Sequence, residues 1–190
     1  MYTNLTFDKY YRLLIASQEG ELDNVTIVSI VTGQSVDYWK QSTDRGLFNS
    51  ILKDITNNMN ALNGEMPKEF MGVETPKDLG YVPCGVYEDA KIVAKKIYEG
   101  EGFERMLYYP ELIAGYFQWK QDGNYDSSFA KKLEDDIWKQ NASHVVSICS
   151  FFFENLNESK AGTQIGLPSQ TTKVKKWKQA INYFTSRLGL

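Results

Sequence analysis

The chain has 190 residues, of which 42% are hydrophobic and 24% charged, with 24 acidic side chains, 21 basic ones, one histidine and two cysteines. This composition is too apolar for a disordered chain, and the length suits one globular domain or two small lobes that share a core. The single histidine excludes a multi-histidine metal site, and the sequence has no run of about 18 apolar residues that could span a membrane.

The charge is distributed unevenly along the chain. From Lys173 onward there are five basic residues and no acidic ones, so the residues before it carry a net charge of −8. A body with that charge repels phosphate backbones, which argues against nucleic-acid binding by the whole domain. The basic end can still contact a nucleic acid or an acidic partner, or it is simply a solvated helix face.

Residues 1–64 are predicted to form an N-terminal helical unit. Thr6, Ser35 and Asp44 are good N-caps, and each is followed by apolar residues at helical spacing. The segment from Leu22 to Thr32 is nearly all apolar, and its β-branched residues would allow a strand. A capping residue before its apolar run and a glycine after it favour a short buried helix instead.

The composition changes over residues 65–86, which contain three prolines, three glycines and alternating apolar positions. Prolines exclude a long helix, and the alternation predicts two short strands, so this segment is expected to be a β-hairpin-like connector. The predicted fold class is therefore mostly α: a multi-helix bundle with a small β-hairpin-like element around residues 65–86.

Residues 87–157 are predicted to form a helical core. Pro110 is expected in the first turn of one helix, where its missing N–H does no harm. Asp126 or Ser127 caps the next helix, and Asn141 caps the last one. That last helix is apolar nearly all round, which predicts a place in the middle of the bundle or beneath another chain.

Residues 158–171 are polar and are expected to form a flexible surface loop or arm, followed by a basic amphipathic helix over residues 172–190. Its apolar side chains recur at spacings of three and four, and lysines occupy the other side. Such a helix can complete its own bundle, enter a groove on another subunit, or lie on an anionic membrane. The candidate partner-binding residues are the C-terminal stripe, Val174, Trp177, Ile181, Phe184 and Leu188, and the basic face, Lys173, Lys175, Lys176 and Lys178.

No catalytic set emerges from the sequence, and we expect no enzyme activity, no cofactor and no bound metal. His144 has apolar neighbours and is interpreted as a core or capping histidine. Cys84 and Cys149 are interpreted as small buried residues. A catalytic cleft would require carboxylates from separate elements, whereas the acidic runs are expected to be solvated helix faces: Glu88–Asp89, Glu99/Glu101/Glu104 and Glu134–Asp136.

Six packing and turn stretches occur in a distinctive order: Leu5–Tyr11, Ile27–Gly33, Gly85–Lys91, Tyr109–Ala114, Asp122–Asp126 and Ser150–Phe153. Together they resemble small proteins encoded among the structural and tail-assembly genes of tailed bacteriophages. The similarity is greatest to tail-assembly-chaperone-like and minor virion proteins of phages of Bacteroidetes-type hosts, and it covers most of residues 4–156. Gly115 departs from the pattern, which has a larger apolar residue there.

The resemblance implies a non-enzymatic role in phage morphogenesis, exerted through contacts with other phage structural or assembly proteins or with a second copy of the chain. It places the protein in the host cytoplasm during assembly, or in the virion. Two alternatives stay open. One is a structural subunit of the virion, such as a head–tail connector, tail or internal capsid component. The other is a nucleic-acid-associated protein that uses the basic C-terminal helix.

Overall fold

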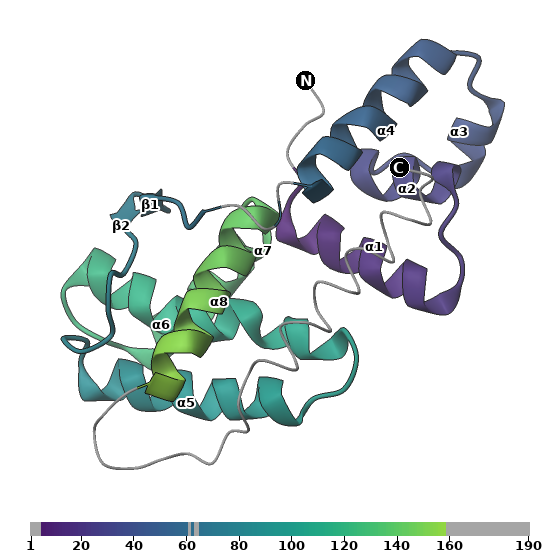
Figure 1. Ribbon diagram of the computed structural model, residues 1–190. Helices are drawn as coiled ribbons and strands as arrows, with labels where there is room; N and C mark the ends of the chain where they lie inside the picture. The colour runs from purple at the N-terminus through teal and green to yellow at the C-terminus, as the bar shows by residue number, and fades with distance from the viewer. Residues whose placement is uncertain (1–4, 61, 63–64, 159–190) are drawn as a thin grey trace. The chain divides into compact units, whose positions relative to one another are not determined.

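A computed structural model describes residues 5–60, 62 and 65–158 of the chain (Figure 1). These residues are mostly helical, with one small two-stranded antiparallel sheet, which confirms the predicted fold class. They divide into two compact units: unit 1 holds Leu5 and residues 9–60, and unit 2 holds residues 6–8, 62 and 65–158. Within the described ranges, no helix combines the length and the apolar character needed to cross a membrane.

Unit 1 contains most of α1 (Phe7–Glu19) together with α2 (Asn24–Thr32), α3 (Val36–Gln41) and α4 (Arg45–Asn60). The segment that would also suit a strand is the helix α2, as predicted.

The capping side chains of unit 1 explain where its helices begin. The carboxylate of Asp23 accepts a hydrogen bond from the Thr26 N–H at 2.7 Å at the start of α2. Ser35 accepts one from the N–H of Tyr38 at 3.1 Å at the start of α3. Trp39 then joins α3 to α2, because its indole N–H donates to the Thr32 hydroxyl at 3.0 Å.

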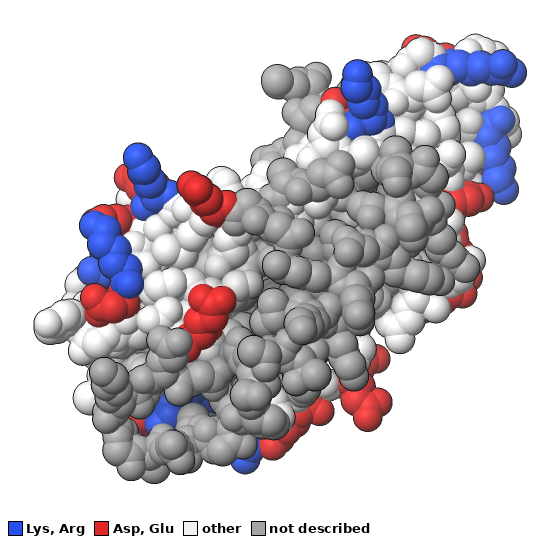
Figure 2. Space-filling view, in the orientation of Figure 1, with Lys and Arg blue, Asp and Glu red and all other residues white. Residues whose placement is uncertain are grey.

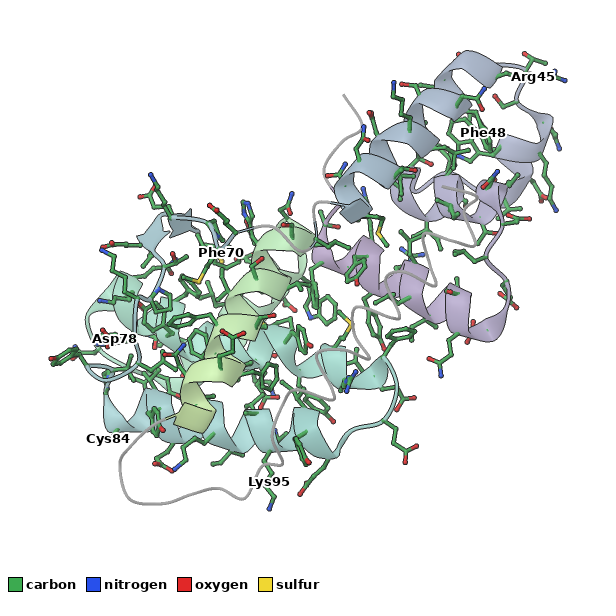
Figure 3. All side chains as sticks on the ribbon, viewed as in Figure 1. Arg45, Phe48, Phe70, Asp78, Cys84 and Lys95 are labelled. Carbon is green, nitrogen blue, oxygen red and sulfur yellow. The ribbon has the colours of Figure 1, made fainter. Side chains whose placement is uncertain are left out.

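The sheet is a hairpin of β1 (Glu69–Phe70) and β2 (Val73–Glu74) in unit 2. Its two turn residues, Met71 and Gly72, both have positive φ, which is the geometry of the tight turns that suit hairpins. Phe70 is buried against Phe117, with 4.9 Å between the ring centroids (Figure 3).

The β-like connector is shorter than predicted, because residues 84–86 are already helical. The next helix, α5, runs from Cys84 to Glu99, and Pro83 is its N-cap. Proline lacks an N–H and has a fixed φ, so it suits the first positions of a helix. Val86 is buried within α5, which explains why the helix begins before the predicted start at Tyr87.

The remaining elements of unit 2 are the 3₁₀ helix η2 (Glu104–Tyr108), α6 (Tyr109–Asp122), α7 (Ser127–Trp138) and α8 (Ala142–Glu158). Helix α6 is central, since it packs on α5, α7 and α8. The predicted helix starts are confirmed: Pro110 lies in the first turn of α6, and Asp126 caps α7 by accepting from the Ser128 N–H at 2.8 Å.

The residues Thr6–Asp8, which include the first two residues of α1, belong to unit 2. The N–H of Phe7 donates to the carbonyl of Gln140 at 2.8 Å, and Thr6 forms a β-bridge with Asn141. The ring of Phe7 is fully buried and lies 4.9 Å from that of Trp138, centroid to centroid. These contacts fix the chain just before α8 begins.

Three sequence interpretations in unit 2 were wrong. Helix α8 is not apolar all round, because one side is buried while His144, Ser150 and Glu154 are exposed. For His144, this exposure overturns the core alternative and leaves the capping alternative as a prediction. Cys84 is exposed, since it follows the N-cap of α5, whereas Cys149 is buried as expected, and both are free thiols (Figure 3 labels Cys84).

Candidate functional site

A pocket of about 260 Å³ lies between α5, α6 and α7, entirely within unit 2. We call it the α5–α7 pocket. Ile92 is 57% exposed, so it brings a large apolar side chain to the solvent edge of the pocket. The floor is made of small and aliphatic residues from all three helices: Val86, Ala90, Val93, Leu112, Ala114, Gly115 and Ala130.

Three carboxylates from three different helices line this pocket: Asp89 of α5, Glu111 of α6 and Glu134 of α7, together with the ammonium of Lys131. The interpretation of the acidic runs as purely solvated faces was therefore wrong for Asp89 and Glu134. The other acids of these two runs, Glu88, Asp135 and Asp136, are exposed, so each run is divided between solvent and the pocket.

The carboxylates of the pocket differ in how far they are neutralised. Lys96 Nζ donates to Glu111 Oε1 at 2.8 Å, and this hydrogen bond raises the pKa of Lys96. Within the described ranges, Glu134 makes no hydrogen bond or ion pair. Burial, and then the nearby charge of Glu111, raise the pKa of Glu134. The charges of Lys131 and Lys96 act against this rise, but neither lysine forms an ion pair with Glu134 in the described part of the chain.

Tyr125 closes one side of the pocket by inserting its ring between two glycines. A β-carbon on Gly85 of α5 would lie 2.9 Å from Tyr125 Cδ1, and one on Gly115 of α6 would lie 3.2 Å from Tyr125 Cε2. The Tyr125 hydroxyl donates a hydrogen bond to Asp89 Oδ2. This arrangement explains why a larger apolar residue is missing at position 115.

The loop that carries Tyr125 is fixed by Gln118, whose side chain is only 4% exposed. Its Oε1 accepts from the N–H of Asp126 at 2.9 Å, and its Nε2 donates to the carbonyl of Asn124 at 3.0 Å. Nε2 also donates to Asp122 Oδ2 at 2.9 Å. The residues immediately before and after Tyr125 are therefore held by one buried amide.

The size and lining of the pocket define what it can bind. Its volume lies below the range of about 300–1,000 Å³ that is usual for small-molecule sites. An apolar floor beside carboxylates suits a protein segment that presents an apolar side chain next to a Lys or Arg side chain. Basic amphipathic segments have this pattern. Within the described part of the chain, no three histidine, cysteine, aspartate or glutamate side chains gather as a metal site would require.

A second hollow, of about 200 Å³, lies between the loop after β2 and α6 and is lined by Tyr81, Trp119 and Lys120 among others. Three of its charged residues already have partners, while among the described residues Asp78 accepts only the N–H of Gly80. Lys77 pairs with Glu74 at 2.8 Å, and Lys120 Nζ lies over the Trp119 ring, 4.6 Å from its centroid. We therefore regard the α5–α7 pocket as the better candidate.

The described part of the structure does not include the residues predicted from the sequence to bind partners. The C-terminal stripe (Val174, Trp177, Ile181, Phe184 and Leu188) and the basic face (Lys173, Lys175, Lys176 and Lys178) lie outside the described residues. On the face drawn in Figure 2, the acidic and basic side chains of the described residues are interspersed.

Comparison of the chain with protein-family models, with curated proteins and with solved structures found no match.

Proposed function

We propose that this chain is a non-enzymatic protein of tailed-phage morphogenesis, similar to tail-assembly chaperones, that binds other phage proteins through the α5–α7 pocket. The observation that carries the proposal is the combination of an apolar floor with the carboxylate of Glu134, which has no ion pair among the described residues, in a volume of about 260 Å³. The ligand that is complementary to this pocket is a segment of a partner protein with both basic and apolar side chains.

The surface around the pocket supports a protein ligand. A stable interface buries about 800 Å² on each partner, which is more than a pocket of this size can supply. Ile92 adds exposed apolar area at its edge. Along α5, Lys96 lies one turn beyond Ile92, and its Nζ is 5.7 Å from the ring centroid of Tyr108, which is 36% exposed. Apolar contact area therefore continues past the pocket.

The resemblance to phage proteins supports the biological setting, because three of the stretches that carry it supply walls of this pocket. Gly85–Lys91 contributes Asp89, Tyr109–Ala114 contributes Glu111, and Asp122–Asp126 contributes Tyr125. Half of the six stretches thus contribute to the candidate binding surface, whereas Ile92 and Glu134 lie outside them.

The proposal is tested by capture from cells infected with the phage that encodes the chain. The tagged full chain is purified with its bound proteins, which are quantified by mass spectrometry beside purified particles. The pocket variants are Ile92→Asp and Glu134→Lys. Their matched controls are Phe129→Asp and Asp135→Lys, because Phe129 is 51% exposed and Asp135 is also exposed, and neither lines the pocket.

We expect the wild type and both controls to capture at least one structural or assembly protein of the same phage, and the pocket variants to retain about a tenth of it or less. Capture that is equal for all variants, or the absence of any phage protein, would contradict the proposal. A stoichiometric copy number in particles would instead select the structural-subunit alternative.

A further inference from the structure

Helix α5 presents a solvent-facing side that runs along the edge of the α5–α7 pocket. Residues at spacings of three and four lie on the same side of a helix. On α5 this spacing gathers seven exposed or half-buried residues, which we call the α5 face: Gly85, Glu88, Asp89, Ile92, Lys95, Lys96 and Glu99. Lys95 points away from the body of unit 2 (Figure 3). Ile92 lies at the centre of the α5 face and is 57% exposed.

The charges of the α5 face change sign at Ile92. Glu88 and Asp89 lie one turn before it, and Lys95 and Lys96 lie one turn after it. When two copies of α5 pack antiparallel with their Ile92 side chains in contact, the acids of each copy lie opposite the lysines of the other. A two-fold interface requires a surface that is complementary to itself in this way, because the same patch is present on both sides.

We propose that the α5 face is the interface of a two-fold dimer, in which a second copy of this chain packs antiparallel on α5. Ile92 contacts its counterpart at the centre. Glu88 faces Lys95 of the second copy, and Asp89 faces Lys96 of the second copy. The dimer covers the edge of the α5–α7 pocket, so a phage protein competes with the second copy. This competition rests on the proposed function, whereas the dimer itself does not.

The charges of the α5 face already have partners in their own unit, and these partners are compatible with a dimer. Four such contacts are present: Lys91 to Glu88 at 3.1 Å, Lys95 to Glu99 at 3.7 Å, Lys96 to Glu111 at 2.8 Å, and the Tyr125 hydroxyl to Asp89. A carboxylate accepts several hydrogen bonds and an ammonium group donates three. Contacts across the dimer are therefore added to the existing ones and do not replace them.

The wider surface around the α5 face has almost no net charge. Helix α5 and the lining of the pocket together hold five acidic and four basic side chains: Glu88, Asp89, Glu99, Glu111, Glu134, Lys91, Lys95, Lys96 and Lys131. Two copies therefore approach without strong repulsion at this surface. The order of the charges along α5 then favours the antiparallel arrangement, since like charges would be opposed in a parallel one.

The size of the surface predicts a dimer that dissociates readily. Helix α5 has 16 residues and is about 24 Å long at 1.5 Å per residue. The half-exposed ring of Tyr108, beside Lys96, adds apolar area at one end. One helix from each copy supplies less than the roughly 800 Å² per partner of a standard interface. The dimer is thus of the weak, transient kind, and a phage protein can displace the second copy.

Sedimentation of the purified full chain at concentrations from about 1 μM to about 1 mM tests the dimer. We expect the wild type to pass from monomer to dimer within this range. Glu88→Lys and Lys95→Glu should each weaken dimerisation about tenfold or more, because each replaces two attractive contacts by two repulsive ones. An equimolar mixture of the two variants should dimerise like the wild type, because the reversed charges then face each other and so do the unreversed ones.

The matched controls are Lys132→Glu and Asp135→Lys, at exposed residues of α7 outside the α5 face. Each control, and their mixture, should dimerise like the wild type, which excludes a general attraction between chains of opposite added charge. The proposal is overturned by a wild type that stays monomeric up to about 1 mM. It is also overturned by unchanged dimerisation of Glu88→Lys, or by a mixture that dimerises no better than the single variants.

The outcome of this experiment is independent of the proposed function. The chain comes from uninfected cells, and neither Glu88 nor Lys95 lines the α5–α7 pocket. Capture of phage proteins by a monomeric chain would contradict the dimer alone. A dimer that captures no phage protein would contradict the proposed function alone.

Discussion

The hydroxyl of Tyr125 donates a hydrogen bond to Asp89 Oδ2, which joins the loop between α6 and α7 to the middle of α5. The tyrosine ring reaches that position between Gly85 and Gly115. A single side chain thereby links α5 and α6 to the loop that leads into α7. We expect the shape of the pocket to depend on this contact.

Removal of the Tyr125 hydroxyl should loosen unit 2 without changing its fold. We expect Tyr125→Phe to lower the free energy of unfolding by about 1–2 kcal/mol, since the lost hydrogen bond ends on a carboxylate. Urea denaturation measures the change. Tyr81→Phe is the matched control, because Tyr81 is 90% exposed. Equal stability of the wild type and Tyr125→Phe would show that the contact does not stabilise the unit.

The same tyrosine should make unit 2 sensitive to alkali. Burial, and then the hydrogen bond to Asp89, raise the pKa of Tyr125 above its ordinary value of 10.0. In the unfolded chain the phenol loses its proton first, so the unfolded state binds fewer protons and stability falls as the pH rises above about 10. The stability difference between the wild type and Tyr125→Phe should therefore shrink over that range. A difference that is constant from pH 8 to pH 11 would contradict this account.

The two glycines beside Tyr125 should resist enlargement. Alanine in a helix is ordinarily favoured over glycine by about 1 kcal/mol. Here the added methyl group meets the ring, and overpacking of this kind costs about 1–3 kcal/mol. We expect Gly85→Ala to be destabilising, and Gly115→Ala to be less so because its contact is longer.

A double-mutant cycle isolates the cause. In a Tyr125→Ala background the ring is absent, so both glycine substitutions should become neutral or stabilising. Calorimetry is carried out on Gly85→Ala, Gly115→Ala, Tyr125→Ala and the two double variants. The differences between them give the coupling free energy between each glycine and Tyr125. Additive effects would mean that the glycines do not act through Tyr125.

Gln118 should be needed to position Tyr125, because it bonds to the residues on both sides of it. Gln118→Leu leaves the Asp126 N–H and the Asn124 carbonyl without this partner, at a cost of about 1–3 kcal/mol for each group that stays unpaired. Gln118→Glu keeps the acceptor but sets a buried carboxylate oxygen against Asp122 Oδ2 and the Asn124 carbonyl, so at neutral pH its effect should be at least as large. Urea unfolding measures the loss of stability, and the chemical shifts of the Tyr125 ring measure the change in its position. Unchanged tyrosine shifts in Gln118→Leu would exclude the positioning role.

Local patterns were sufficient to predict the helices, because each helix start depends on residues close together in the chain. The Asp126 cap and Pro110 illustrate this, since both act within a single turn. The same reasoning misplaced the start of α5. Pro83 and Gly85 were taken as turn residues, but Pro83 caps the helix and Gly85 makes room for Tyr125, which is 40 positions away along the chain.

The candidate site could not be predicted in this way, because its carboxylates come from three helices. Nothing in the sequence pairs Asp89 with Glu134, and Glu111 belongs to no acidic run. The one available signal was the unexpected Gly115, which marks the close approach of a side chain from elsewhere. The exposure of His144 and Cys84 was missed for a related reason, since neighbouring apolar residues do not show which side of a helix faces solvent.

The central claim is that the α5–α7 pocket binds a basic apolar segment of a partner protein, and a nuclear magnetic resonance titration of the full chain with a synthetic helical peptide of leucines and lysines measures this most directly. The account predicts that the amide signals of pocket residues such as Ala90, Gly115 and Ala130 shift most as the peptide is added. Glu134→Lys should reduce those shifts and Asp135→Lys should not. Shifts spread evenly over unit 2, or shifts that are indifferent to Glu134→Lys, would contradict the claim.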